Sequence, residues 1–126
     1  MGRKQQISLS RKTFEKGDRL LHRPEFIRLS NYGKRYRNQH FIVYFIKNNH
    51  NRCRLGITVT RKVGKAAKRN RIKRLAREYF RQNRHIFGEN WDISLIAKKH
   101  CADIPNKAAL SSLENIFDRI ATYSNN

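Results

Sequence analysis

The chain has few cysteines and no long apolar run, and each shortage excludes a class of protein. Its two cysteines, Cys53 and Cys101, form neither a CxxC metal clip nor a disulfide framework, so we expect reduced thiols. No stretch approaches the ~20 apolar residues of a membrane-spanning helix. No apolar core of a signal peptide follows the basic N-terminus. The sequence therefore predicts a soluble, cytoplasmic protein that does not associate with membranes.

Acidic residues are also scarce, which argues against catalysis by this chain. Its nine Asp and Glu residues are scattered along the sequence, whereas a metal-dependent nuclease needs clustered carboxylates to hold two cations. The five histidines lack the spacing of metal ligands. We therefore expect no catalytic residue and no metal site in the protein alone.

Positive charge is what the chain has in excess. Its 29 Lys and Arg residues give a formal net charge of +20, and such an excess usually has a partner that neutralises it. Nucleic acid is the first candidate and an anionic membrane surface the second. A hydrophobic content of 38% over 126 residues suffices for one modest core.

Patterns along the chain predict one α+β domain over residues 19–121, after a flexible basic arm (1–18) and before a frayed C-terminus (122–126). Helices are expected to start at Pro24, where Gly33 would follow the last turn, at Lys65 and at Pro105. β-Branched and alternating apolar residues predict three strands, with a basic connector or short strand before the first. The three strands are expected over 40–46, 54–60 and 91–97. We expect the first two to pair as an antiparallel hairpin and the third to follow a crossover helix, giving a small, mostly antiparallel sheet packed with helices.

The most informative segment is the basic run over residues 62–77, which leads into a helix expected over 65–83. On a helical wheel one arc is apolar and would face the sheet; it consists of Ile72, Leu75, Ala76, Tyr79 and Phe80. The adjoining arc consists of Arg69, Asn70, Lys73, Arg74, Arg77 and Arg81. Arg71 points elsewhere, to another contact. Like charges four residues apart destabilise a helix by about 0.2–0.5 kcal/mol per pair, so this layout favours a surface that phosphates complete.

Charge and spacing leave several interpretations open. The helix could present a solvated basic face without a ligand, and spacing alone does not separate RNA from DNA. A DNA-binding protein would need a recognition helix with dimer symmetry, which the sequence does not display. A noncatalytic RNA-binding module, such as a ribosome-associated protein, also fits.

The basic run closely resembles a motif of the protein subunit of bacterial ribonuclease P. That family's Arg-Asn-Arg-x-Lys-Arg hallmark stands here as Arg69-Asn70-Arg71-Ile72-Lys73-Arg74, preceded by Gly64-Lys65-Ala66. The resemblance covers most of the chain, from about residue 20 to about residue 120. It includes the segments 23–26, 41–44, 54–62 and 91–98.

The resemblance implies a ribonucleoprotein endonuclease, a hydrolase of tRNA processing, in which the RNA subunit is the catalyst and holds the magnesium ions. The protein would bind ribonuclease P RNA and the single-stranded 5′ leader of precursor tRNA, with no obligate protein partner. It also implies an α/β sandwich with a left-handed crossover, against the usual right-handed rule.

The resemblance assigns two sets of binding residues. Those expected to bind the RNA subunit are Lys65, Lys68, Arg69, Asn70, Arg71, Lys73, Arg74 and Arg77. Those expected to bind the leader are Phe26, Ile42, Tyr44, Thr58, Lys73 and Arg77. Without the resemblance, Phe26 and Tyr44 would be interpreted as ordinary core. Ser30 departs from the family pattern, where a second aromatic is common, so the leader platform is expected to be weaker here or completed by Tyr32.

Overall fold

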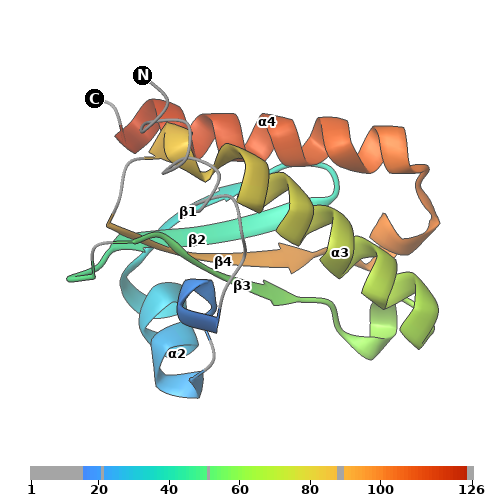
Figure 1. The fold of residues 1–126 in the computed structure, drawn as a ribbon. Helices are drawn as coiled ribbons and strands as arrows, with labels where there is room; N and C mark the ends of the chain where they lie inside the picture. The colour runs from blue at the N-terminus through green and yellow to red at the C-terminus, as the bar shows by residue number, and fades with distance from the viewer. Residues whose placement is uncertain (1–15, 21, 51, 88–89, 125–126) are drawn as a thin grey trace.

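The fold consists of seven main elements joined by short connections (Figure 1). The computed structural model describes residues 16–20, 22–50, 52–87 and 90–124. The helices are α2 (Arg23–Tyr32), α3 (Ala66–Asn83) and α4 (Asn106–Ser124), and the strands are β1 (Lys34–Arg37), β2 (Phe41–Lys47), β3 (Arg54–Thr58) and β4 (Trp91–Ala97). Four short 3-10 helices complete the chain: η1 (Lys16–Asp18), η2 (Arg61–Val63), η3 (Arg84–Phe87) and η4 (Lys99–Asp103). The predicted helices and strands are all confirmed, with boundaries that shift by a few residues.

The predicted pairing of the strands is partly wrong. The sheet order is β1-β2-β4-β3, so β4 lies between the two strands that we expected to form a hairpin. β1 and β4 both pair antiparallel with β2, whereas β3 pairs parallel with β4. The sheet is therefore mostly antiparallel, as predicted. The left-handed sense of the β3–α3–β4 crossover stays a prediction.

Burial explains why β4 takes the central place. Its first five residues, Trp91 to Leu95, are all buried, including those that point to opposite faces. A strand that is buried on both faces is covered on both faces of the sheet, and this favours an inner position such as the one β4 occupies. The polar loop after β2 made a local hairpin look favourable, but the burial of β4 outweighs that proximity.

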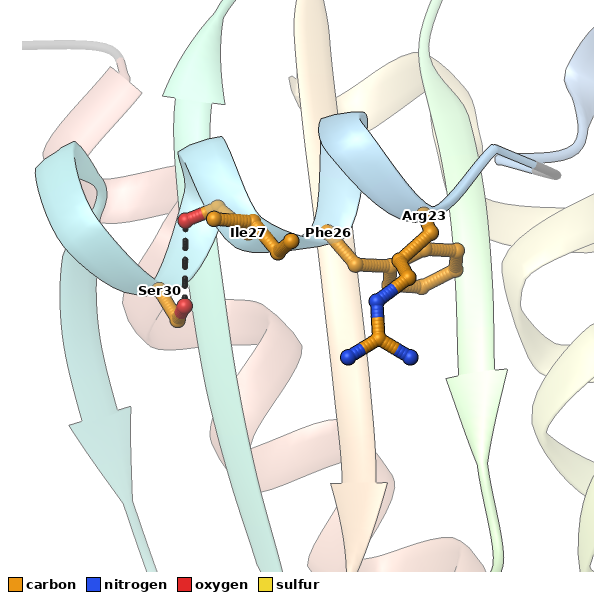
Figure 2. Close-up of a pocket in the computed structure, with 4 residues that line it drawn as sticks. All are labelled: Arg23, Phe26, Ile27 and Ser30. Carbon is orange, nitrogen blue, oxygen red and sulfur yellow. Dashed lines mark hydrogen bonds between the residues drawn. The ribbon is translucent and has the colours of Figure 1, made fainter.

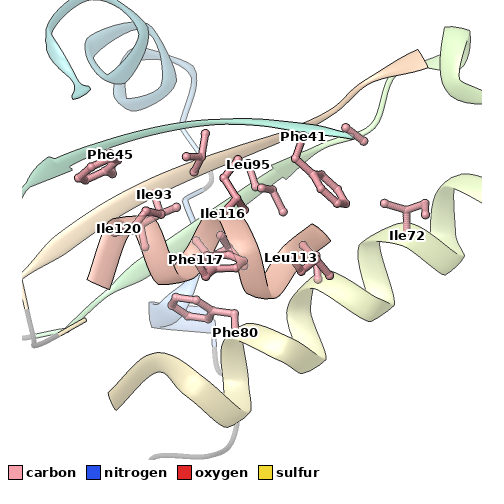
Figure 3. Close-up of a cluster of buried hydrophobic side chains, with 14 of the residues drawn as sticks. Phe41, Phe45, Ile72, Phe80, Ile93, Leu95, Leu113, Ile116, Phe117 and Ile120 are labelled. Carbon is pink, nitrogen blue, oxygen red and sulfur yellow. The ribbon is translucent and has the colours of Figure 1, made fainter. Parts of the chain in front are cut away.

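The helices divide between the two faces of the sheet. Helices α3 and α4 cover one face, and α2 lies alone on the other (Figure 1). The main core fills the space under α3 and α4, where Phe41 and Val43 of β2 and Phe80 of α3 are all 0% exposed. Side chains of α4, among them Leu113 and Phe117, close the core (Figure 3). The predicted apolar arc of the basic helix is confirmed, since Ile72, Ala76 and Phe80 are buried and Leu75 and Tyr79 pack against the core.

Both ends of the domain differ from the predicted boundaries. Residues 1–15, most of the predicted arm, lie outside the described part of the chain, but Lys16–Asp18 form η1 and Asp18 is buried. The Asp18 carboxylate accepts ion pairs from Arg52 at 3.2 Å and Arg84 at 2.8 Å, which hold η1 on the domain. At the other end α4 continues to Ser124, past the expected end at residue 121.

Gly33 follows α2 as predicted, but its conformation is extended rather than left-handed, with φ −78° and ψ 159°. Glycine is needed there for space, because a Cβ atom would lie 2.5 Å from the Leu29 carbonyl oxygen and 3.1 Å from that of Phe45. The close approach lets β1 begin directly after the helix.

None of the helices in the described ranges combines the length and apolar character needed to cross a bilayer.

Candidate nucleic-acid interface

The face of the sheet that α2 only partly covers is built from three rows of side chains. Register places Arg37, Ile42, Ile96 and Thr58 side by side across β1, β2, β4 and β3. The next row, toward α2, consists of Arg35, Tyr44, Ser94 and Gly56. The third row consists of Ile46, Asp92 and Arg54. Because directly paired residues point to the same side of a sheet, all three rows belong to this one face, which we call the open face.

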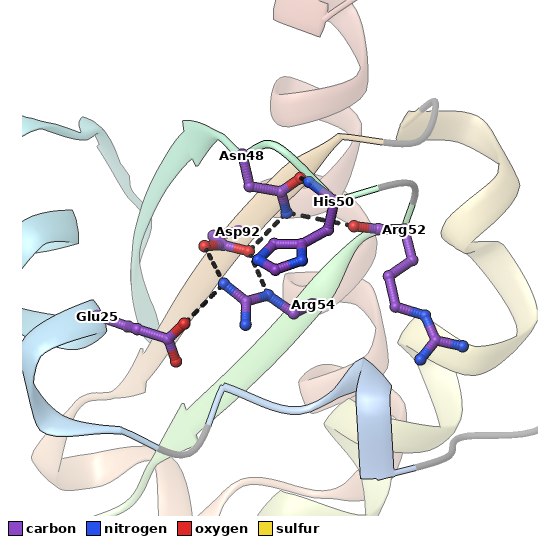
Figure 4. A network of polar contacts seen from close by, with 6 residues as sticks. All are labelled: Glu25, Asn48, His50, Arg52, Arg54 and Asp92. Atoms are coloured by element: carbon purple, nitrogen blue, oxygen red, sulfur yellow. Dashed lines mark hydrogen bonds and ion pairs between the residues drawn. The ribbon is translucent and has the colours of Figure 1, made fainter.

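An ion-pair network occupies the third row and fixes α2 on the sheet. The Arg54 guanidinium donates to both carboxylate oxygens of Asp92, at 2.8 and 2.7 Å, and pairs with Glu25 of α2 at 2.8 Å. Asn48 donates to the same Asp92 carboxylate at 2.7 Å (Figure 4). The hydrogen bond with Asp92 is the main cause that raises the pKa of Arg54. Two of the scattered acids thus meet in space, but with an arginine between them, which suits structure rather than metal binding.

The first row and the β1–β2 end of the second row remain accessible beside α2, whereas Ser94 and Gly56 are buried. The Phe26 ring lies against Gly56, where a Cβ atom would come within 2.5 Å of it. An open hollow of about 480 Å³ is lined by Arg23, Phe26, Ile27 and Ser30. These side chains extend from α2 over the strands (Figure 2), and Ile27 is 46% exposed. The open face therefore offers one aromatic ring from the helix and another, the half-buried Tyr44, from the sheet.

The predicted leader-binding residues of α2 and the sheet come together on this face. Ile42 and Thr58 share the first row with Ile96 between them, and Tyr44 shares the second row with Gly56, on which Phe26 packs. Sequence reasoning missed Ile96, Ser94, Arg35 and Arg37. The alternation within β1 and β4 could have placed each on one face of its strand, but only the pairing places them beside Ile42 and Tyr44.

The connection into α3 is shaped by Gly64. Its φ of 158° is the one positive value among the described residues, and it carries the chain from η2 to Lys65, the N-cap of α3. The Arg69 side chain turns back to this point and donates through Nε to the Gly64 carbonyl oxygen at 3.1 Å. Part of the Arg69 guanidinium thereby stabilises the loop, and its other nitrogens donate no hydrogen bond to the residues that the structure describes.

One flank of α3 is fastened to the connection before α4. The Arg71 guanidinium donates to the Ala102 carbonyl at 3.0 Å and the Ile104 carbonyl at 2.8 Å, and also bonds Asn106. Lys68 on the same flank pairs with Asp103 at 2.8 Å. The prediction that Arg71 leaves the cationic ridge for another contact is confirmed.

Burial raises the pKa of the nearby Cys101 thiol to about 11, so this buried, free cysteine stays protonated.

On the other flank and the outer side of α3, Arg81 pairs with Glu78, but the cations before it in the helix have no acidic partner among the described residues. Arg77 donates to the Lys73 carbonyl within the helix at 3.3 Å, and the Lys73 ammonium makes no contact with an acid among the described residues. The same holds for Arg74 and Lys65, and Asn70 is exposed beside them. The eight residues predicted to bind the RNA subunit therefore divide: Arg71 and Lys68 make internal contacts, and the others face outward wholly or in part.

The chemical groups on these two surfaces are suited to binding nucleic acid. In the part of the chain that the structure describes, no three His, Cys, Asp or Glu side chains gather as a metal site would require. The surface instead combines unpaired guanidinium and ammonium groups with aromatic and apolar side chains. Those are the elements with which proteins hold the phosphates and unstacked bases of single-stranded nucleic acid.

Solved structures of bacterial ribonuclease P proteins have the same fold. The protein from Staphylococcus aureus superposes with a TM-score of 0.78 at 32% identity, covering 82% of this chain and 95% of that one. The protein from Thermotoga maritima gives a TM-score of 0.73 at 37% identity, covering 81% and 96%.

Sequence comparisons agree with the structural ones. The chain is 44% identical over 112 residues to the ribonuclease P protein component of Desulfatibacillum aliphaticivorans, covering 89% of this chain and 95% of that protein. It is 40% identical over 91 residues to that of Thermotoga maritima, covering 72% and 78%. The family model described as Ribonuclease P matches residues 14–121, nearly the whole domain. The resemblance seen in the basic run is confirmed, and the chain belongs to the family of bacterial ribonuclease P protein components.

Proposed function

We propose that this chain binds ribonuclease P RNA and the 5′ leader of precursor tRNA, and so promotes removal of the leader by the RNA subunit in the cytoplasm. The observation that carries the proposal is the combination of two surfaces on one rigid domain. The outer side of α3 presents cations that have no acidic partner among the described residues, and the open face presents Phe26 and Tyr44 beside the uncharged side chains of Ile42, Ile96 and Thr58. Membership of the ribonuclease P family supports these two partners.

The outer side of α3 is the proposed docking surface for the RNA subunit. Arg69, Asn70 and Arg74 lie at helical spacing with no acid between them. Arginine suits this role because its planar fork binds phosphate oxygens in pairs. Lys65 at the N-cap extends the same surface. Arg71 contributes by holding α3 in place against the connection to α4.

The open face is the proposed site of the leader. Stacking on aromatic rings stabilises a bound base by about 1–3 kcal/mol and tolerates any base, which suits leaders of varied sequence. Phe26 and Tyr44 supply the rings, and Ile42 and Thr58 supply the floor in the row beside them. Lys73 and Arg77 lie on the flank of α3 that faces away from α4, so they would hold leader phosphates on the β3 side of the sheet.

Catalysis is assigned to the RNA subunit, with magnesium held mainly by the RNA. The carboxylates of Glu25 and Asp92 are already committed to Arg54, and that of Asp18 to Arg52 and Arg84. What this chain would supply is positioning, since it neutralises repulsion between two RNAs and holds the leader extended.

The test is reconstitution of leader removal. Purified protein, a bacterial ribonuclease P RNA and a precursor tRNA are combined at low magnesium, where the RNA alone is inactive, and release of the leader is followed. We expect the protein to restore cleavage at the mature 5′ end, and the protein without RNA to release nothing. If the RNA cleaves at high magnesium but the protein gives no rescue at low magnesium, the proposal is wrong.

A further inference from the structure

Strand β1 places two arginines on the open face, outside the residues assigned to RNA or leader so far. Arg35 pairs with Tyr44 and Arg37 with Ile42 in the β1–β2 ladder. The alternate residues Lys34 and Tyr36 pair with Phe45 and Val43, whose side chains are buried under α4. The strand is thus basic on both sides, but only Arg35 and Arg37 share a face with the proposed leader site.

Among the described residues, neither arginine is neutralised by an acid, and the one internal contact of either guanidinium is that of Arg35 with the Tyr44 ring. Both side chains are exposed, and neither forms an ion pair with an acid in the described ranges of the chain. Arg35 lies with its Cζ atom 6.0 Å from the centre of the Tyr44 ring. Arg37 is held through its backbone, because its carbonyl accepts a hydrogen bond from Arg119 at 2.9 Å. This bond fixes the strand at Arg37 and leaves the exposed guanidinium able to bind a phosphate.

The two arginines lie at the β1 margin of an uncharged floor, whose other margin is β3, the strand beside which α3 packs on the opposite face of the sheet. From β1 to β3 the sheet spans three strand spacings, about 14 Å, and the side chains between are Ile42, Ile96 and Thr58 in one row and Tyr44, Ser94 and Gly56 in the next. An uncharged floor with cations along its β1 edge matches a single strand whose bases rest on the floor and whose phosphates lie along that edge.

The small side chain of Ser30 keeps the way to β1 open. Ser30 lies on the last turns of α2, on the side of β1 and β2 (Figure 2), and its hydroxyl donates to the Ile27 carbonyl at 3.1 Å. It lines the hollow together with Phe26 and Ile27. A bulky side chain here would narrow the passage between the hollow and the β1 edge, so this end of the leader site is open.

We propose that Arg35 and Arg37 bind phosphates of the 5′ leader where it leaves the open face over β1, farther from the cleavage site than the contacts of α3. The inference rests on the proposed function and extends its leader site to the edge of the sheet. It assigns these residues to long leaders, because a short leader ends before it reaches β1. Cations on an edge strand can also serve only to prevent pairing with the sheet of another molecule. Lys34 separates this role from leader binding, because it lies on the same edge strand but on the opposite face.

The experiment measures binding of the reconstituted holoenzyme to precursor tRNAs whose leader grows one nucleotide at a time. The double variant Arg35→Gln/Arg37→Gln is compared with wild type and with Lys34→Gln, which removes a cation from the same strand on the opposite face. We expect the double variant to bind long-leader substrate roughly tenfold more weakly, with a smaller salt dependence. Short-leader substrate and mature tRNA should bind as in wild type, and Lys34→Gln should change neither.

A second measurement locates the contact. Single leader phosphates are replaced by uncharged methylphosphonates, and the linkage whose neutralisation weakens wild-type binding should have no further effect in the double variant. Equal losses for short and long leaders would overturn the inference in favour of contact with the RNA subunit. A matching loss in Lys34→Gln, or an unchanged long-leader affinity, would overturn it as well. In each case cleavage by the wild-type holoenzyme still decides the proposed function separately.

Discussion

The two flanks of α3 carry similar side chains and do opposite things. On the flank toward α4, Arg71 and Lys68 are bonded to the connection that precedes that helix. On the other flank and the outer side, Lys73 and Arg74 make no contact with an acid in the described part of the chain. A run of cations in a sequence therefore does not describe one surface. The partner of each cation is decided by what the fold places beside it.

The largest expected effect on folding comes from removing Arg71. Arg71→Ala should lower the free energy of unfolding by about 1.5–3 kcal/mol, because it leaves the Ala102 and Ile104 carbonyls without their charged donor. Arg71→Lys should recover little of that loss, since one ammonium cannot reproduce the planar fork. Urea denaturation measures both variants.

The matched control is Arg74→Ala, which removes an exposed arginine from the same helix. If Arg71→Ala were as stable as Arg74→Ala and instead reduced the salt dependence of RNA binding, the contrast between the two flanks would be wrong.

A second comparison is between residues of the open face that bind the leader and residues that only stabilise the fold, and Tyr44 tests it. Tyr44→Ala should weaken binding of precursor tRNA by about 1–3 kcal/mol, the usual contribution of one stacked base, and leave mature tRNA binding unchanged. The comparison of the two substrates is made with the reconstituted holoenzyme. Tyr123→Ala, which changes an exposed tyrosine near the end of α4, is the control and should affect neither. Equal weakening of both substrates would identify Tyr44 as a structural residue.

Arg74 should contribute to RNA binding without contributing to folding. Arg74→Ala should change stability by no more than about 0.5 kcal/mol, as is usual for surface positions. The logarithmic slope of RNA-subunit affinity against salt should fall by about 0.7–0.9, the loss of one phosphate contact. Titration of the RNA subunit at several salt concentrations measures the slope. An unchanged slope would remove Arg74 from the docking surface.

The sequence predicted the directions in which the side chains of α3 point, but not the residues that they contact. The wheel placed Arg71 away from Arg69, Lys73 and Arg77, and periodicity predicted the buried arc. It could not predict that Arg71 binds carbonyls more than thirty residues away, because the position of η4 depends on how the whole chain packs. The arc follows from the local period of the helix, whereas the contact depends on tertiary structure.

The same limit explains the wrong hairpin. Alternation in 54–60 correctly put Gly56 and Thr58 on the face opposite Leu55, but the strand beside them was misassigned. The choice of neighbour depends on which strand is buried on both faces, and β4 arrives only after α3. Ile42 and Thr58 were therefore assigned correctly to one face while Ile96, which separates them, was missed.

The smallest effect is expected from the Lys68–Asp103 pair, which also belongs to the bonded flank. Its side chains are 54% and 72% exposed, so water screens the attraction. The hydrogen bond from Lys68 lowers the pKa of Asp103 from its ordinary value of 3.8. A carboxyl whose pKa is lower in the folded chain stabilises the fold above its unfolded pKa, and the contribution is lost as pH falls through the folded pKa. Wild type should thus be slightly more stable than Lys68→Ala at neutral pH, and the two should converge in acid. Urea denaturation across that range, with Asp103→Asn as the matched variant, tests the pair. A difference that persisted below the folded pKa would mean that Lys68 stabilises the flank through the packing of its aliphatic stem rather than through its charge.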